Sequence, residues 1–227
     1  MKNLKILNLE KNQIPPGALK VIASLPNLQQ LQLSGNLLGK PTPELAAKLH
    51  TAQKDPTHPP LTLPELPTGL KQITLASNYL SHVPRAILSN HLTKLVKLDL
   101  SNNHLATLPT EIAKLKNLTE LLADDNSIVS LPKAIGLLSD LKVLSLKNNK
   151  ISAGTYPYVD GKNPQPLPAP LFTNTKIVDL NLHGNPLTNT ELNRMEGFDA
   201  FLERRQAIKT TVLLGGGLTS MTGCGLE

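Results

Sequence analysis

Leucines and polar residues follow one fixed order three times in the middle of the chain. The three copies begin at Leu95, Leu118 and Leu141, so the interval is 23 residues both times. Each copy reads LxxLxLxxNxL, in which the L positions hold aliphatic residues and most x positions hold polar ones. A pattern that returns at a fixed interval of this length indicates a chain built from successive similar coils.

The centre of each copy has the alternation of a short β-strand. In Leu98-Asp99-Leu100, neighbouring side chains of an extended chain point to opposite faces, so the leucines face inward and the aspartate faces solvent. One coil cannot enclose its own leucines, whereas stacked coils can share a continuous core. The pattern therefore predicts parallel strands that lie side by side along the stack.

Four less regular copies extend the pattern over most of the chain. They begin at Leu4, Leu28, Leu70 and Ile177. The interval from the second copy to the third is 42 residues, and the interval from the sixth to the seventh is 36 residues. Both exceed one period, so we expect insertions at about residues 39–66 and 152–172.

Each copy carries one asparagine shortly after the strand. An asparagine side chain has both donors and an acceptor, so it can bond buried backbone groups of neighbouring coils where no strand ladder exists. We expect these side chains to stack as a ladder. They are Asn12, Asn36, Asn78, Asn103, Asn126, Asn149 and Asn185.

The repeats resemble a known family. LxxLxLxxNxL is the order of leucine-rich repeats, and the connecting segments from Leu108 and Leu131 read LPxxIxxLxxL. This connection is similar to that of the intracellular, Ras-group-related class of leucine-rich repeat proteins. The resemblance implies an α/β solenoid of about seven repeats, with a right-handed, curved parallel sheet and a helical or irregular convex side.

The C-terminal segment is similar to the end of a group of small animal, plant and protist proteins of this class. Their last repeat also runs into a capping segment like the one from Glu191 to Arg204. This resemblance implies a cytosolic interaction protein with no established catalytic activity. The chain departs from the group in its long second interval, its abrupt start and its Gly-rich end.

A helix is predicted directly after the last repeat. Thr188-Asn-Thr-Glu191 has the spacing of a capping box, which starts a helix. The apolar residues that follow, Leu192, Met195, Phe198 and Leu202, recur near one helical face, with Phe201 beside it. We therefore divide the chain into a repeat domain at 1–187, a capping helix at 188–208 and a flexible tail at 209–227.

The first copy begins only three residues after Met1, although solenoids normally carry a polar capping segment at each end. The inward side of the first coil would then be exposed. We expect either a missing upstream segment, cover by a partner, or enough polarity from Lys2, Lys5 and Glu10.

The outward side chains of the strands would form the concave face, where a partner protein would bind. We assign to this face Lys71, Thr74, Lys97, Asp99, Glu120, Leu122, Asp124, Lys142, Ser145 and Asn181. Leu122 is apolar where the pattern favours a polar residue. We hypothesise that an apolar residue of the partner contacts Leu122, while Asp99, Asp124 and Lys142 orient it; the alternative is a single tolerated exposed leucine.

Composition limits the other function classes. The net charge is +6, but the lysines and arginines are spread singly and aromatic residues are only 3%, which argues against nucleic-acid binding. The single cysteine, together with the lack of a secretory signal or a long apolar span, favours the cytoplasm and argues against a membrane protein.

Candidate chemistry is sparse. His50, Asp55 and His58 have the nearest approach to metal-ligand spacing, but no further ligand follows. Gly215-Gly216-Gly217 lacks the Lys and Ser/Thr of a phosphate loop, and Cys224 has no basic partner in the sequence. We therefore expect no enzyme activity, no metal and no cofactor.

The sequence predicts a monomeric, non-catalytic module that binds a partner protein on the concave face. The alternative is a recognition domain that is one piece of a larger signalling or regulatory protein associated with a GTPase or a phosphatase.

Overall fold

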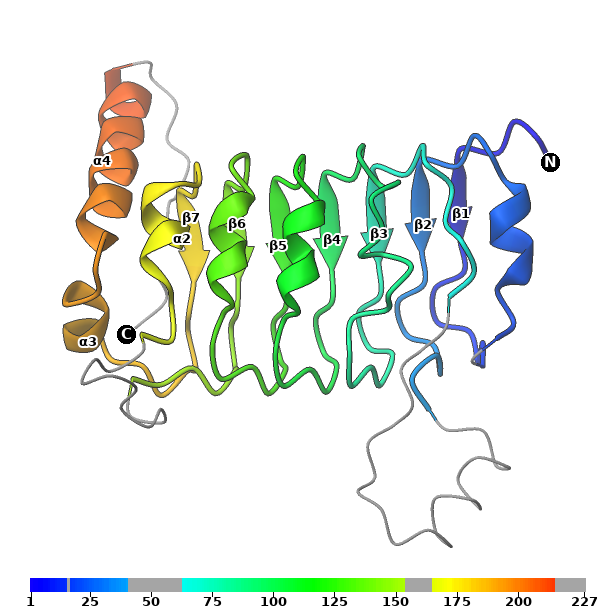
Figure 1. Cartoon of the computed structure of the whole chain (residues 1–227), viewed down its shortest axis with the longest axis horizontal. Coiled ribbons are helices and arrows are strands. Elements are labelled where there is room, and N and C mark those ends of the chain that lie inside the picture. The colour runs from blue at the N-terminus through cyan, green and yellow to red at the C-terminus, as the bar shows by residue number, and fades with distance from the viewer. Residues whose placement is uncertain (16, 41–62, 154–164, 215–227) are drawn as a thin grey trace, which may run out of the picture.

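Seven short strands form one parallel sheet in chain order (Figure 1). The computed structural model describes residues 1–15, 17–40, 63–153 and 165–214 of the chain. The strands are β1 (Ile6–Asn8), β2 (Gln30–Gln32), β3 (Gln72–Thr74), β4 (Lys97–Asp99), β5 (Glu120–Leu122), β6 (Val143–Ser145) and β7 (Asp179–Asn181). We number the coils 1 to 7 after these strands. The open parallel sheet confirms the predicted solenoid.

The strand register follows the repeat. The middle residue of each strand is the second L of the motif, and it pairs with the same position of the next strand, as Leu98 does with Leu121. The register also holds across both long intervals, because Leu31 pairs with Ile73 and Leu144 pairs with Leu180. The strand register is therefore the same on both sides of each long interval.

Short helices lie on one side of the sheet, on the connections between strands, and are nearest the viewer in Figure 1. We call this side the back of the sheet. They are η1 (Lys20–Ser24), η2 (Thr110–Lys114), η3 (Lys133–Leu137) and α2 (Ala169–Thr173). A proline precedes η2, η3 and α2, and its fixed φ suits the first turn of a helix. Each turn buries an aliphatic residue, such as Ile112 in η2 and Ile135 in η3.

The core is continuous along the stack. The inward leucines and isoleucines of coils 2 to 7 are almost fully buried, and they form one cluster with the apolar residues of the helices behind them. In coil 1 the corresponding residues Leu4, Leu7, Leu9 and Ile14 are only partly buried. The sequence predicted this exposure of the first coil.

Two helices, not one, cover the last coil. They are α3 (Asn189–Asn193) and α4 (Phe198–Leu214), so the prediction of a single helix at 188–208 is wrong. Gly197 lies between them with φ +80°, a conformation that breaks a helix and that glycine adopts easily. Because α4 continues to Leu214, residues 209–214, which we assigned to a flexible tail, are helical.

The predicted capping box is confirmed at the start of α3. The Glu191 backbone N–H donates to the Thr188 hydroxyl at 3.3 Å, and the Thr188 N–H donates to the Glu191 carboxylate at 2.8 Å. Of the residues predicted near the apolar face, Leu202 is the exception at 45% exposed, whereas Phe201, predicted beside that face, is fully buried. Phe201 packs with Phe198 and with Phe172 of α2, at ring-centroid distances of 5.4 and 6.2 Å.

Several predictions fall on residues outside the described ranges. These are His50, Asp55, His58, the glycines 215–217 and Cys224.

Candidate functional site

The outer face of the sheet is formed by the first and third residues of each strand, while the middle residue points into the core. In β4, for example, Leu98 is fully buried, whereas Lys97 and Asp99 are half-buried. The backbone pleat imposes this alternation, and the core leucines fix which side faces in. We call this surface the outer sheet face; it is the face that we predicted to be concave.

An asparagine ladder holds neighbouring coils together at one end of the strands. The Asn103 amide donates to the Leu75 carbonyl of the preceding coil at 3.0 Å and to the Leu100 carbonyl of its own coil at 2.9 Å. Its side-chain oxygen accepts from the Leu80 N–H at 2.9 Å. Asparagines that also donate to the preceding coil are Asn36, Asn78, Asn126, Asn149 and Asn185.

Two members of the predicted ladder depart from this pattern. Asn12 is exposed and donates only to the Leu9 and Glu10 carbonyls of its own coil. Within the described residues, the buried Oδ1 of Asn78 has no hydrogen-bond partner. This missing bond lies between coils 2 and 3, which are separated by the long interval of 42 residues.

The residue directly before each ladder asparagine has a positive φ. The values are 54° at Lys11, 73° at Gly35, 56° at Ser77, 52° at Asn102, 52° at Asp125, 52° at Asn148 and 73° at Gly184. Glycine, asparagine and aspartate tolerate this left-handed region better than most residues. Their recurrence at this position was a signal that our sequence reasoning missed.

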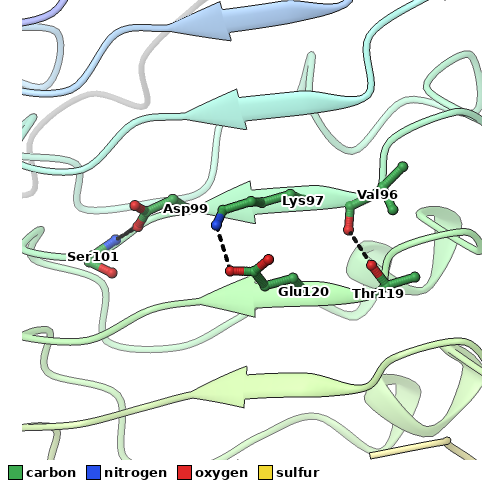
Figure 2. Close-up of polar contacts among 6 residues, drawn as sticks. All are labelled: Val96, Lys97, Asp99, Ser101, Thr119 and Glu120. Carbon is green, nitrogen blue, oxygen red and sulfur yellow. Dashed lines mark hydrogen bonds and ion pairs between the residues drawn. The ribbon is translucent and has the colours of Figure 1, made fainter. Parts of the chain in front are cut away.

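Lys97 and Glu120, which we predicted as separate binding residues, form an ion pair (Figure 2). The Lys97 Nζ lies 2.6 Å from Glu120 Oε1, and their side chains are 34% and 30% exposed. Strand register is the cause, because β4 and β5 place these two residues opposite each other. Each charge is therefore partly neutralised before any partner arrives.

The predicted orienting aspartates also have bonds within the repeat. Asp99 Oδ1 accepts from the Ser101 N–H at 2.9 Å (Figure 2). Asp124 Oδ1 accepts from the Ser145 hydroxyl at 2.6 Å and from the Lys147 N–H at 2.7 Å. Asp124 therefore connects coils 5 and 6, and both aspartates support the backbone that presents the face.

Thr74 and Ser145 were predicted to face solvent, but both are buried. Each is only 8% exposed. The Thr74 hydroxyl donates to the Glu10 carboxylate at 3.4 Å, and the Ser145 hydroxyl donates to Asp124. Longer side chains from other coils, Glu10 of coil 1 and Asp124 of coil 5, contact these two short ones, so they contribute little surface to a partner.

The remaining predicted residues differ in their exposure and in their position relative to the strands. Lys71 and Lys142 are exposed, but each precedes its strand by one residue. Asn181 is half-buried at the end of β7, and its Oδ1 accepts from the His183 N–H at 3.1 Å.

Leu122 lies half-buried in the middle of this face. The next strand adds a second apolar side chain, because Val143 of β6 is opposite Glu120 while Leu122 is opposite Ser145. Leu122 and Val143 thus lie diagonally across two neighbouring strands. Sequence reasoning missed Val143, although it occupies the motif position that holds Gln72, Lys97 and Glu120 in other coils.

Among the described residues, the structure offers no cluster of side chains suited to metal binding. No group of three or more His, Cys, Asp and Glu side chains converges in this part of the chain. A search of the described helices also finds none with the length and apolar character needed to cross a membrane.

Comparisons with known proteins agree with this geometry. The leucine-rich repeat family matches residues 68–128. Osteomodulin from Bos taurus is 32% identical over 151 residues, which are 66% of this chain and 30% of osteomodulin. The chain therefore spans less than a third of that relative.

Solved structures of bacterial proteins share the fold. A leucine-rich repeat protein of Leptospira interrogans has 28% identity and a TM-score of 0.61, over 84% of this chain and 40% of that one. Internalin C2 from Listeria monocytogenes has 23% identity and a TM-score of 0.58, over 86% and 69%, and its likeness concerns the fold alone. Together with the seven stacked coils, these matches support a leucine-rich repeat protein with an open parallel-sheet solenoid.

Proposed function

We propose that this protein is a non-catalytic module that binds a partner protein on the outer sheet face, around Leu122 and Val143. Leucine-rich repeat domains are generally protein-interaction modules, and a stiff sheet that displays side chains from successive coils suits this use. The observation that carries the proposal is an apolar pair on β5 and β6 of a face that, apart from exposed Ile6 on β1, is polar.

The surroundings of the pair define the kind of partner. Leu122 and Val143 offer a small apolar contact, the Lys97–Glu120 pair lies beside it, and exposed Lys142 adds a positive charge. An apolar side chain of the partner, surrounded by polar and acidic groups, would complement this area. In such an interface, the buried apolar anchor supplies affinity and the polar rim supplies specificity.

Affinity capture from the source cell tests the proposal. Wild-type protein, Leu122→Asp and Val143→Lys would be immobilised, with Val21→Asp as the matched control because Val21 is 59% exposed on η1, behind the sheet. We expect a specific set of proteins on wild type and control, and its loss on both outer-face variants. Circular dichroism and thermal melting would establish that all four proteins fold.

Two results would contradict the proposal. One is retention of the same partners by folded Leu122→Asp and Val143→Lys; the other is equal loss with Val21→Asp. Because two independent substitutions probe the pair, a folding defect in one of them leaves the other informative.

We further propose that the chain acts as a monomer in the cytoplasm. This placement rests on its single cysteine and mixed surface charge. A resemblance of the C-terminal segment to leucine-rich repeat-containing protein fifty-seven supports the same compartment. The alternative, a recognition domain of a larger signalling or regulatory protein, would use the same outer sheet face.

A further inference from the structure

A groove lies behind the sheet where the row of helices is interrupted. Coils 4 and 5 carry η2 and η3, whereas the described connection between β3 and β4 contains no regular helix (Figure 1). This connection is two residues longer than the regular period, since Leu70 and Leu95 are 25 residues apart. The resulting hollow between coils 3 and 4 has a volume of about 650 Å³.

The floor of the groove is apolar. Val83 and Leu88 of coil 3 are 6% and 7% exposed, and they line it together with Ala106 and Pro109 of coil 4. A volume of this size matches sites that accept a small ligand or one or two side chains of a peptide. The apolar floor would favour an aliphatic or aromatic group over a purely ionic ligand.

The rim of the groove is positively charged. Arg85 of coil 3 and Lys114 of coil 4 both line it, and Glu111 of coil 4 is the acidic exception. In the connections 80–94 and 105–117, the charged residues are Arg85, Lys94, Lys114 and Lys116 against Glu111 alone. All four cations are exposed. A local excess of this sign attracts acidic partners and orients them.

The two rim cations act on the same place. The backbone N–H and the Thr110 hydroxyl lower the pKa of Glu111, and the charges of Lys114 and Arg85 lower it further. One carboxylate therefore feels both cations, although they come from different coils. A carboxylate that enters the groove would meet both cations, because Arg85 and Lys114 both line it.

We propose that this groove binds an acidic peptide segment, with an apolar side chain on the Val83–Leu88 floor and a neighbouring carboxylate facing Arg85 and Lys114. The site lies on the opposite side of the sheet from Leu122, so it is independent of the outer sheet face and both could be occupied together. A nucleic acid fits less well because no Phe, Tyr or Trp lines the groove for base stacking, and His82 is the one ring among its lining residues.

Fluorescence anisotropy with the full chain tests this site. The probe is a labelled peptide of acidic residues around Leu-Phe; the comparison peptides replace either the acids with their amides or Leu-Phe with Ala-Ala. We expect the acidic apolar peptide to bind best, and Arg85→Glu with Lys114→Glu to weaken it by about tenfold or more. The matched control is Lys20→Glu with Lys133→Glu, the same charge change on η1 and η3.

Specific outcomes would overturn the proposal. These are equal weakening by the control pair, equal binding of the Ala-Ala peptide, or tighter binding of single-stranded RNA than of the acidic peptide. The first two would reveal nonspecific charge attraction, and the third a different class of ligand. Thermal melting would establish that both double variants are folded, so that any change in peptide binding comes from the altered surface charge.

Discussion

Coil 1 and coil 5 carry the same motif, yet the structure uses its residues differently. Leu121 of coil 5 is fully buried, whereas Leu7 at the same position of coil 1 is only partly buried. Asn126 bonds both its own coil and coil 4, whereas Asn12 bonds its own coil alone. The difference arises because coil 5 has a neighbour on each side and coil 1 has one.

This comparison shows that a motif residue stabilises the solenoid in proportion to the neighbours it can reach. In stacked repeats, stability is close to a sum of terms for each coil and for each interface. The central coils are therefore the stiffest support for an interaction face. Leu122 and Val143 lie there, on strands β5 and β6.

The largest expected contrast comes from the core leucines. Leu121→Ala should lower the free energy of unfolding by about 3–5 kcal/mol, because it leaves a cavity between two coils. Leu7→Ala should lower it by only about 1 kcal/mol, since much of that side chain is already in contact with water. Urea unfolding of the two variants measures both changes, and equal losses would refute the neighbour argument.

The ladder asparagines should give the next largest contrast. Asn126→Ala removes bonds to the Leu100, Ala123 and Asp124 carbonyls and leaves the Leu105 N–H without its acceptor. We expect a loss of about 2–3 kcal/mol, because buried backbone groups lose their partners. Asn12→Ala should cost less than about 0.5 kcal/mol, since water can replace its exposed bonds. Matching denaturation midpoints for the two variants would disagree with this interpretation.

Substitutions at the positive-φ position should have a smaller effect on the free energy of unfolding, and they should raise it instead of lowering it. Lys11→Gly should raise stability by about 0.5–1 kcal/mol, because glycine relieves the cost of a left-handed conformation. Asp125→Gly should gain less, because it also removes the 2.7 Å bond that the Asp125 carboxylate accepts from the Asn148 amide. Differential scanning calorimetry measures both, and a larger gain at Asp125 would count against the argument.

The C-terminal end should show the smallest effect, which depends on pH. Hydrogen bonds from the backbone and side chain of Thr188 lower the pKa of Glu191. The folded state therefore favours the ionised form. The resulting stabilisation is complete above the ordinary glutamate pKa, about 4.3, and is lost as the pH falls through the lowered folded value.

Thermal melting from neutral to acid pH tests this linkage. The Tm difference between wild type and Glu191→Gln should be largest at neutral pH and should shrink in acid. Glu203→Gln, an exposed change on α4, is the matched control and should show no such trend. A difference that grows as the pH falls would have the wrong sign for this account.

Repeat spacing predicted the parts of the structure that depend on periodicity. The interval located all seven strands and the ladder asparagines, because register and core burial follow directly from the motif. It failed for Thr74 and Ser145, since their burial depends on Glu10 and Asp124 from other coils. Such contacts depend on side-chain length in neighbouring coils, which the motif does not specify.

Features outside the period were also hard to predict. Helical spacing after Thr188 suggested one continuous helix, but α3 ends at Asn193 and Gly197, with its positive φ, directly precedes α4. The groove at coils 3 and 4 lies beside a connection that is two residues longer than the regular period and contains no regular helix. Both features reflect local backbone geometry and not the hydrophobic pattern.

Amide hydrogen exchange of the full chain tests most directly whether neighbouring coils set local stability. The Leu9 N–H donates to the Gln32 carbonyl at 2.8 Å, and the Ala123 N–H donates to the Ser145 carbonyl at 2.9 Å, so the bonds themselves are alike. We predict that Ala123 exchanges roughly a hundredfold or more slowly than Leu9, because coil 5 opens only with its neighbours. Equal exchange rates at the two amides would contradict the account.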